Sequence, residues 1–591
     1  MSGAGVRPLT LMNTRVLMLA VLVAAFVSPA AFFAQASAGP QGRGGAQGQR
    51  PPRDVRERET GTAIVRGRVH TADTGAPIRR AQIRAVSSGS RDTRLVTTDA
   101  EGRFELRDLP AGRWELTASK GGYVAMRYGQ RRPFEAGRPL ELADGQVVQQ
   151  VNFALPRGAV IAGRVLDEFG DPVAGARVQA LRYQLSQGTR RLSPTGMVAQ
   201  TDDTGAFRLY GLMPGEYYVS ALLRALPPDD TTDSTGYAPT YYPGTGSVTE
   251  AQPIPLGVSE EASISFALQA VRTARVAGTV VTSTGVPLSS GVVMLLAPDG
   301  AGAGPMAFGA GNRIRSDGSF LLSNVAPGTY TLMASNGGPA LRGGGGDIEM
   351  GTLPITVVGD DVRGVTVVTG RGAALGGVVV AAPGSSATLM KANLQVTAPM
   401  VGDGFGGFPG LGGGAGPFGG RNVAEDGTFT VTNLFGARLL RLNGLPQEWM
   451  LESVIVDGRD VTDRPIEFAP NGDITGARIV VTDRVTEVSG SVTAADGKSA
   501  SRDFTVIVFP DEEIRWTAPS RFVRSARPDQ QGLFKIRALP PHDRYLAVAV
   551  DYLEQGEETD GELLASLRGQ ATVFRLRAGD TAALNVKLVA R

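Results

Sequence analysis

The residues of this chain that could support metal or acid–base chemistry are few. The 591 residues include no cysteine and only two histidines, His70 and His542. Most metal sites and most acid–base triads need histidine or cysteine side chains. His70 and His542 are far apart in the sequence, and each falls at the end of an expected strand or in a turn. We interpret both as solvated loop histidines, and we predict no catalytic residue, no metal site and no cofactor.

Paired acidic residues are the next candidates for chemistry. Asp202-Asp203 and Glu512-Glu513 could be drawn as the two carboxylates of a glycosidase. Such an enzyme needs two convergent carboxyl groups about 5–9 Å apart, whereas neighbouring residues on a strand point to opposite faces. The acidic turns could also hold Ca²⁺, which prefers oxygen ligands, but no spacing identifies a site. The sequence therefore favours a protein that is not an enzyme.

Five aromatic residues are candidates for binding. Tyr237, Tyr241 and Tyr242 lie in a Gly/Pro-rich insertion, and Trp449 and Trp516 do not recur in the repeats described below. An exposed aromatic ring has an apolar face and a polar tip, which suits a flat platform for a sugar. The alternative is that these rings pack against neighbouring strands. We predict a binding role for all five and keep the packing role open.

A repeated stretch must position these side chains. Thr97–Leu116 reads as an acidic turn closed by Gly102, a strand with alternating apolar residues, a Pro-Gly turn and a second strand. We interpret it as a β-hairpin. Copies begin near Asp99, Asp202, Asp317, Asp426 and Asp529.

A second marker precedes each copy of this stretch. It is a short strand with a central glycine, at Gly67, Gly163, Gly278, Gly377 and Gly490. The intervals are about 100 residues, the usual size of a domain rather than of a solenoid repeat. The fold is therefore predicted to be all-β, a tandem array of about five small transthyretin-like or Ig-like β-sandwiches.

The predicted organisation begins with an export signal. Arg7 and Arg15 precede an apolar run, and Ala36-Ser37-Ala38 supplies the small residues of a cleavage site. The predicted segments are a signal peptide (1–38), a disordered linker (39–62) and five β-sandwiches (63–156, 157–270, 271–370, 371–484 and 485–591). Within the last two sandwiches we expect a two-residue hairpin at Asp457-Gly458 and a short helix over 561–569.

The formal charge of +2 is unevenly distributed. Residues 39–140 contain 20 basic and 11 acidic residues, a net charge of +9, and the chain beyond 140 carries −9. Blocks of opposite charge can steer association with charged partners. The basic segment is either an ordinary solvated surface or a contact for an anionic envelope polysaccharide.

The quoted patterns resemble a known family. GDPVAGARV with TDDTGAFRLYGLMPGEYYV, and GAPIRRAQI with TTDAEGRFELRDLPAGRWEL, are similar to the carboxypeptidase regulatory-like domain. The resemblance is good over the first three sandwiches and fainter over the last two, and it implies a transthyretin-like or starch-binding-like β-sandwich. The wider arrangement resembles large exported proteins of environmental bacteria. The family's regulatory domain is not the catalytic one, and neither histidine has the His-x-x-Glu spacing of the zinc peptidases.

Together these features predict a non-catalytic, exported binding or scaffold protein of the bacterial envelope. Its partners would be a polysaccharide or an envelope protein, contacted through loops, with no nucleic acid and no transmembrane domain beyond the signal. The alternative is an array of carbohydrate-binding modules that use exposed aromatics. A less favoured alternative is an accessory part of a peptidase or receptor system. The expected location is the periplasm, the outer surface or the medium, and the oligomeric state stays open.

Overall fold

The computed structural model describes residues 60–591, except 88–91, 133, 187, 224–234, 297–312, 337–347, 392, 402–419, 495, 497–498 and 518. The predicted signal peptide (1–38) and nearly all of the predicted linker (39–62) lie outside the described residues. The described part is built of β-strands with a single short α-helix, α1 (Gly561–Leu567), where the sequence predicted one. The predicted all-β fold is confirmed. No helix among the described residues is long and apolar enough to cross a membrane.

Hydrophobic clusters define five sandwiches. The buried residues of each of the five largest clusters come from a single stretch of chain, and the last stretch also holds a smaller second cluster. We number the sandwiches by these stretches: Ala63–Leu155, Ala159–Leu268, Ala274–Val367, Ala373–Val481 and Val488–Val586. Alternating burial along the strands produces these cores, because every second side chain faces inward. The exact domain boundaries stay a prediction.

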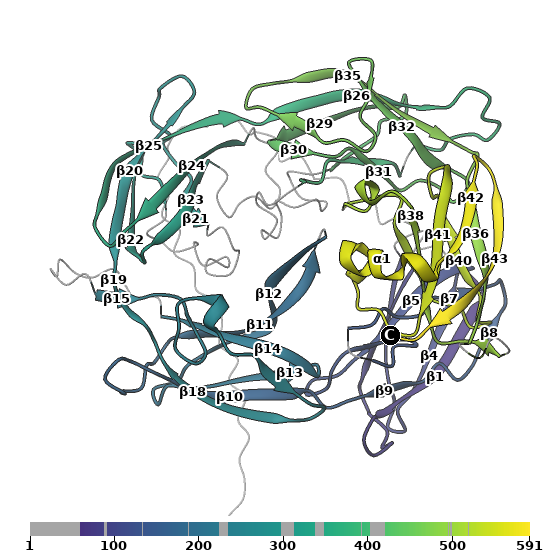
Figure 1. Ribbon diagram of the computed structural model, residues 1–591, viewed down its shortest axis with the longest axis horizontal. Helices are drawn as coiled ribbons and strands as arrows, with labels where there is room; N and C mark the ends of the chain where they lie inside the picture. Colours follow the sequence, from purple (N-terminus) through teal and green to yellow (C-terminus); the bar gives the residue numbers. More distant parts are fainter. Residues whose placement is uncertain are drawn as a thin grey trace, which may run out of the picture. The chain divides into compact units, whose positions relative to one another are not determined.

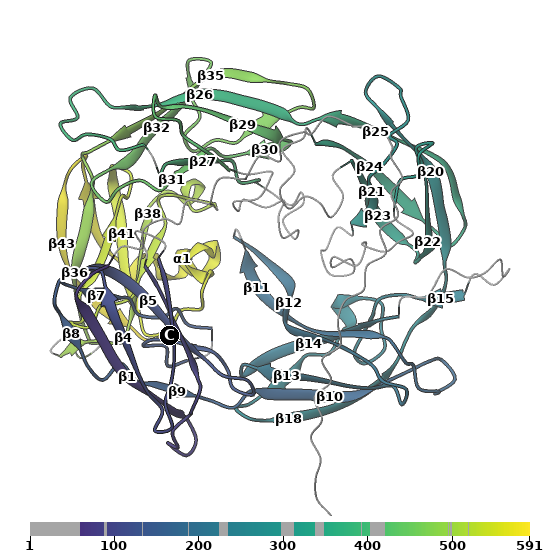
Figure 2. The ribbon, with the colours of Figure 1, turned by 180° about the vertical axis from the view of Figure 1, so that it is seen from behind.

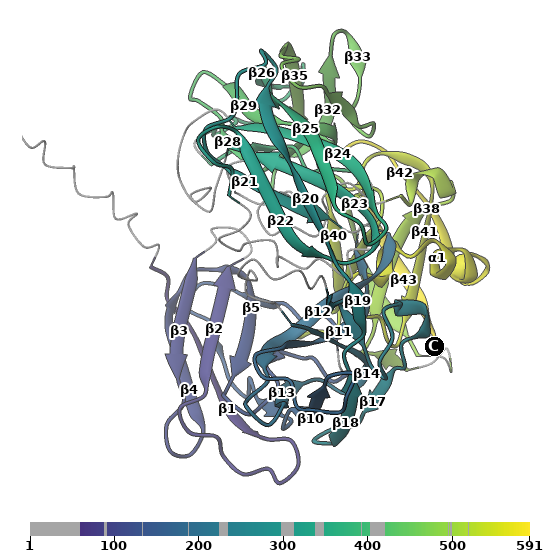
Figure 3. The same cartoon turned by 90° about the vertical axis from the view of Figure 1, so that its left-hand side faces the viewer.

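Sandwich 1 consists of two sheets. In one, β1 (Ala63–Thr71) pairs with β4 (Arg103–Leu109), and in parallel with β8 (Val147–Val148) and β9 (Phe153–Leu155). The other has the order β3-β2-β5-β6 with β7 also on β5, and Figure 3 shows β2 between β3 and β5. Its strands are β2 (Gln82–Ser87), β3 (Thr93–Thr97), β5 (Gly112–Ser119), β6 (Met126–Arg127) and β7 (Leu140–Leu142).

Sandwiches 2 and 3 keep this arrangement around β10 and β20, and Figure 1 shows β10 beside β13 and β18. The strands of sandwich 2 are β10 (Ala159–Leu166), β11 (Arg177–Ser186), β12 (Thr189–Gln200), β13 (Ala206–Leu212), β14 (Gly215–Leu222), β15 (Thr235–Tyr237), β16 (Thr240–Tyr241), β17 (Ile254–Leu256), β18 (Glu261–Ala267) and β19 (Ala270–Arg272), with the 3-10 turn η1 (Val248–Glu250). Those of sandwich 3 are β20 (Ala274–Thr282), β21 (Val292–Leu296), β22 (Ser319–Val325), β23 (Gly328–Ser335), β24 (Glu349–Val357) and β25 (Val362–Arg371).

Sandwiches 4 and 5 are built around β26 and β36, and Figure 2 shows β26 beside its parallel partner β35. The strands of sandwich 4 are β26 (Ala373–Ala381), β27 (Gln395–Thr397), β28 (Gly420–Asn422), β29 (Thr428–Leu434), β30 (Gly436–Arg438), β31 (Arg441–Asn443), β32 (Met450–Val456), β33 (Arg459–Asp460), β34 (Ile466–Phe468) and β35 (Ile474–Thr482). Those of sandwich 5 are β36 (Glu487–Thr493), β37 (Ala500–Ser501), β38 (Thr505–Pro510), β39 (Arg524–Ala526), β40 (Phe534–Arg537), β41 (His542–Val550), β42 (Thr572–Leu576) and β43 (Thr581–Val589), with 3-10 turns at Glu513–Arg515, Glu557–Thr559 and Arg568–Gln570. The predicted turn at Asp457-Gly458 does join a hairpin, β32–β33.

The central glycine of each first strand has a steric cause. A Cβ on Gly67 would lie 1.8 Å from the carbonyl oxygen of Val151, and one on Gly163 would lie 1.9 Å from that of Ile264. The corresponding distances at Gly278, Gly377 and Gly490 are 1.9, 2.2 and 1.8 Å. Because the backbone of the neighbouring parallel segment passes this close to each of these glycines, only glycine fits at the five positions.

The predicted hairpin in the repeat is wrong. β4 pairs with β1, whereas β5 pairs with β2, so the Leu109–Gly112 connection crosses from one sheet to the other. The same holds in the other copies, where β13, β22, β29 and β40 each pair with the first strand of their own sandwich. A residue with positive φ precedes each crossing, and these residues are Asp108, Gly211, Asn324, Asn433 and Ala538. In the first four sandwiches the pairing register shifts at this point, which is a β-bulge that turns the strand toward the other sheet.

A buried polar contact fixes the crossing. In four sandwiches an aromatic side chain donates a hydrogen bond back to a carbonyl oxygen of the connection, and the pairs are Trp114–Pro110, Tyr217–Met213, Tyr330–Ala326 and Tyr545–Pro540. Arg438 does this in sandwich 4, with its guanidinium on the carbonyl oxygens of Phe435 and Ala398. Burial lowers the pKa of Arg438 to about 10. Trp114 belongs to the core, since none of its surface is exposed.

Candidate functional site

Three of the five predicted binding residues lie in hydrophobic cores. Tyr241 is 2% exposed, Trp449 2% and Trp516 4%. The indole N–H of Trp516 donates to the carbonyl oxygen of Pro510 (2.7 Å), and the ring packs edge-on against Phe509. A buried ring offers no face to a sugar. The structure therefore gives these three side chains the packing role that the sequence left open.

The other two candidates are half-buried on sandwich 2. The hydroxyl of Tyr237 donates to Glu168 Oε2 at 2.7 Å. Burial, together with this hydrogen bond and the charge of Glu168, raises the pKa of Tyr237 to about 12. Tyr242 packs edge-on against Phe266, with ring centroids 6.1 Å apart. A binding role for Tyr237 and Tyr242 stays a prediction.

The two histidines do not lie in solvated loops, as the sequence analysis predicted. His70 is a half-buried residue of β1. His542 begins β41, its side chain is 11% exposed, and its ring packs edge-on against Phe522 and Tyr545. The imidazole of His542 therefore packs among aromatic side chains, and its Nε2 lies 3.5 Å from a carboxylate oxygen of Glu512. Among the described residues, no group of three or more His, Asp and Glu side chains is placed to hold a metal ion.

A cluster of charged residues joins sandwich 1 to sandwich 5. The connection between β6 and β7, residues 128–132 and 134–139, carries the Glu135 carboxylate, which is 3% exposed. Glu135 Oε1 lies 2.5 Å from Nη1 of Arg527, whose side chain is 2% exposed. Glu135 Oε2 accepts the backbone N–H groups of Arg131 and Arg132. A buried charge is tolerated when it is paired and hydrogen-bonded, as it is on both sides here.

Asp503 extends this pair into a network. Its carboxylate accepts hydrogen bonds from Arg527 (2.7 Å), Arg138 (2.8 Å) and Arg131 (3.0 Å). Burial raises the pKa of Asp503, but the hydrogen bond from Arg138 and the nearby guanidinium charges outweigh it, so the pKa lies below its ordinary value. Asp503 is therefore held as a carboxylate between two sandwiches.

Further contacts extend this junction. Arg127 donates to Gln555 (3.0 Å), and the amide of Gln530 donates to the carbonyl oxygen of Glu141 (2.7 Å). Arg132 lies 3.3 Å from Asp551. Sandwich 2 also takes part: the guanidinium of Arg182 stacks over Phe134, 3.5 Å from the ring centroid, and pairs with Glu554. Three sandwiches thus meet around one connection of sandwich 1.

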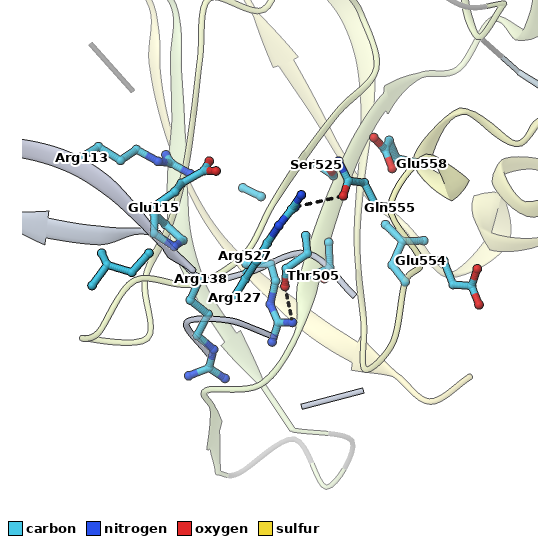
Figure 4. Close-up of a pocket in the computed structure, with 16 residues that line it drawn as sticks. Arg113, Glu115, Arg127, Arg138, Thr505, Ser525, Arg527, Glu554, Gln555 and Glu558 are labelled. Carbon is cyan, nitrogen blue, oxygen red and sulfur yellow. Dashed lines mark hydrogen bonds between the residues drawn. The ribbon is translucent and has the colours of Figure 1, made fainter. Parts of the chain in front are cut away.

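A cavity of about 320 Å³ lies at this junction. Figure 4 shows side chains from sandwiches 1 and 5 around it, with Arg127 hydrogen-bonded to Gln555. Its charged lining residues are Arg113, Glu115, Arg127, Arg138, Arg527, Glu554 and Glu558. The cavity is lined mainly by charged and polar side chains, and the junction around it is our candidate functional site.

Sequence reasoning missed the residues of this site. Glu135, Asp503 and Arg527 belong to no motif, and Arg131 is 372 residues from Asp503. The available signal was the charge imbalance, in which residues 39–140 are basic and the rest of the chain is acidic. Several arginines of the basic segment contact acidic residues of sandwich 5. Part of the positive charge of the basic segment is therefore paired with acidic residues of the same chain.

Comparison with known families identifies the first two sandwiches. Residues 64–156 and 160–269 each match the carboxypeptidase regulatory-like domain. The predicted resemblance is confirmed over these two segments, and its extension to sandwich 3 stays a prediction. A comparison with the curated proteins gave no match.

Several solved structures are weakly similar to part of this chain. The TIE protein of Bacillus anthracis is 14% identical with a TM-score of 0.15, over 53% of this chain and 51% of its own length. The minor pilin GBS52 of Streptococcus agalactiae is 13% identical with a TM-score of 0.22, over 36% of this chain and 98% of its own. The shaft pilin SpaA of Lactobacillus rhamnosus GG is 12% identical with a TM-score of 0.20, over 36% and 99%. We draw no functional argument from similarities this weak.

Proposed function

We propose that this chain is a non-catalytic, exported scaffold of the bacterial envelope whose five sandwiches are braced against one another and present loops to a polysaccharide or protein partner. Export rests on the predicted signal peptide. The absence of catalytic activity is inferred from the regulatory-like domains and from the structural use of the conspicuous charged side chains. The periplasm, the outer surface and the medium all fit this proposal.

The observation that carries this proposal is the buried ion pair between Glu135 and Arg527. It joins the first sandwich to the last across 391 intervening residues of sequence. A chain of independent binding modules on flexible linkers needs no such contact, because each module would act alone. A scaffold that holds its loops in fixed relation to one another does need it.

The aromatic carbohydrate-binding alternative rests on two residues. Tyr237 and Tyr242 are half-buried, whereas the three other candidates are buried. Two half-buried rings provide a smaller stacking surface than the predicted platform. We therefore rank this alternative second.

The proposal is tested by binding of the chain from Gly39 to Arg591 to glycans and to extracts of envelope proteins, at low and at high salt. A scaffold should retain a defined partner at both salt concentrations. Retention at low salt only would indicate general attraction to the basic segment, because surface charge is screened by salt. No retention under either condition contradicts the proposal.

A matched pair of variants separates the two partner classes. The double variant Tyr237→Ala/Tyr242→Ala should abolish retention of a polysaccharide if the aromatic alternative is right. Replacement of the exposed Tyr210 of β13 by Ala serves as the control. Unchanged retention of the polysaccharide by the double variant would eliminate the aromatic alternative and leave the loops of the scaffold as the contact.

A further inference from the structure

The cavity at the junction of sandwiches 1 and 5 has hydrogen-bonding groups that the protein does not use. Nε of Arg527 and Nε of Arg138 are buried and have no hydrogen-bond partner among the described residues. The side chain of Arg527 is 2% exposed, and both residues line the cavity. A buried donor without a partner is costly, so such a group usually meets an acceptor that is not part of the chain, such as a water molecule or a ligand.

Two further charged groups line the cavity without a partner. Arg113 and Glu115, on β5, form no ion pair or side-chain hydrogen bond with any residue that the structure describes. Arg113 is half-buried, so its guanidinium has lost part of its hydration without gaining a counter-charge. The cavity therefore offers a free cation and a free anion as well as the two buried N–H donors.

The lining restricts the chemistry of a ligand. Guanidinium groups bind carboxylates with short, charge-assisted hydrogen bonds. Glu554 already accepts from Arg182 and Tyr552, and Glu558 from the backbone N–H of Gly556. The carboxylate of Glu115 is free to accept a hydrogen bond, which a hydroxyl or ammonium group of a ligand can donate. A volume of about 320 Å³ is at the lower end for ligand sites, so the ligand is small.

We propose that this cavity binds a small molecule that carries a carboxylate together with hydroxyl or ammonium groups, with the carboxylate on Arg113 and the buried arginines. Acidic sugars and α-amino acids share this chemistry. The inference goes beyond the scaffold function, since a scaffold needs no small ligand. A ligand here would also touch both sandwiches and stabilise their junction.

Isothermal titration calorimetry on the chain from Gly39 to Arg591 tests the proposal, with glucuronate and glutamate as probes. Glucose, which lacks the carboxylate, and acetate, which lacks the donors, are the controls. We expect one of the two probes to bind with a dissociation constant of about 1 mM or tighter, and both controls to bind at least tenfold more weakly. The stronger probe identifies the class, sugar or amino acid. If neither probe binds, or if glucose or acetate binds as well, the proposal is wrong.

Variants locate the binding in the cavity. Arg113→Gln and Glu115→Gln remove charges that hold no described partner, so both should leave the melting temperature unchanged. Arg113→Gln should weaken probe binding at least tenfold. Arg84→Gln, on the neighbouring strand β2, removes an exposed arginine outside the cavity and should have no effect. Wild-type affinity in Arg113→Gln overturns the assignment, and it does so whether or not the chain retains an envelope partner.

Discussion

The junction between sandwiches 3 and 4 and the junction between sandwiches 1 and 5 differ in the kind of side-chain contact at their centre. In the first, Phe435 of sandwich 4 is 6% exposed and packs in a cluster with Met294, Met333 and Met350 of sandwich 3. In the second, the central contact is the ion pair of Glu135 and Arg527, extended by Asp503. The first junction is centred on apolar packing and carries one partly exposed ion pair, Arg371 with Asp473, whereas the second is centred on buried charges.

The difference follows the order of the chain. Sandwiches 3 and 4 are consecutive, and β25 ends only one residue before β26 begins. Because the connection is so short, each of these two sandwiches has a high effective concentration at the surface of the other. A contact of low specificity is therefore enough to keep them together. Sandwiches 1 and 5 must find each other from opposite ends of the array, where wrong contacts with the other sandwiches compete. Complementary charges on sandwiches 1 and 5 steer their association and select one relative orientation, and they contribute less to the strength of the contact.

The largest effect is expected at the charged junction. Glu135→Ala leaves the buried guanidinium of Arg527 without its main counter-charge, and we expect a loss of about 3–5 kcal/mol in the free energy of unfolding. Urea denaturation measures it. The double variant Glu135→Leu/Arg527→Met should recover most of the loss, because the uncompensated charge is gone. Glu115→Ala is the control, and a loss as small as that of the control would contradict the structural role of the pair.

A similar but smaller loss is expected at the apolar junction. Phe435→Ala removes a buried ring and should cost about 3 kcal/mol, at the low end for phenylalanine. The loss should be the same at low and high salt, because the contacts that Phe435 makes in this cluster are apolar. The free energy of unfolding at two NaCl concentrations measures this, and a strong salt dependence would show that the two junctions do not differ as described.

Acid should loosen the charged junction. The lowered pKa of Asp503 means that its carboxylate stabilises the fold above its unfolded pKa of about 3.9 and that this stabilisation is lost as the pH falls through the lower, folded value. Hydrogen exchange of 127–132, corrected for the intrinsic rate, should therefore rise below about pH 4, ahead of exchange in β29 and β30 of sandwich 4. Asp503→Asn should exchange quickly already at pH 7. An identical pH profile in the wild type and this variant would rule out Asp503 as the titrating group.

The smallest effect is expected for the exposed pairs at the rim. Arg132→Gln removes a guanidinium that is 49% exposed beside Asp551 and should change the stability by less than about 1 kcal/mol. Urea denaturation at low salt measures the change. A loss comparable to that of Glu135→Ala would mean that the rim, rather than the buried pair, holds the junction together.

The local features of the fold could be predicted from the sequence. Gly67 and its counterparts mark the place where two backbones approach. The acidic turn at Asp202 is closed by Gly205 with a φ of +70°, and the Asp202 carboxylate accepts the backbone N–H of Ala206. The Leu109–Gly112 connection was misread because turn residues look the same whether the next strand pairs with the previous one or joins the other sheet. The bulge at Asp108 decides between the two, and an aspartate with positive φ is not recognisable from its type alone.

The candidate site could not be predicted, because it depends on distant pairing. In the sequence, Glu135 and Arg527 are ordinary charged residues, and only the contact between two sandwiches brings them together. The charge imbalance along the chain was the only sequence feature that indicated this contact. The buried aromatic candidates illustrate the opposite difficulty. Trp449 and Trp516 stand out in the sequence because they do not recur, yet each fills a core position particular to its own sandwich.

The contact between the first and last sandwiches is the central claim, and cross-linking tests it most directly. The chain has no cysteine, so Arg132→Cys with Asp551→Cys introduces the only pair of thiols, at two partly exposed positions whose native side chains lie 3.3 Å apart. With a short bis-maleimide we predict rapid intramolecular cross-linking at low protein concentration, which Glu135→Ala strongly reduces and which neither single-cysteine variant gives. Failure of the double-cysteine chain to cross-link, or cross-linking only between molecules, would contradict the account.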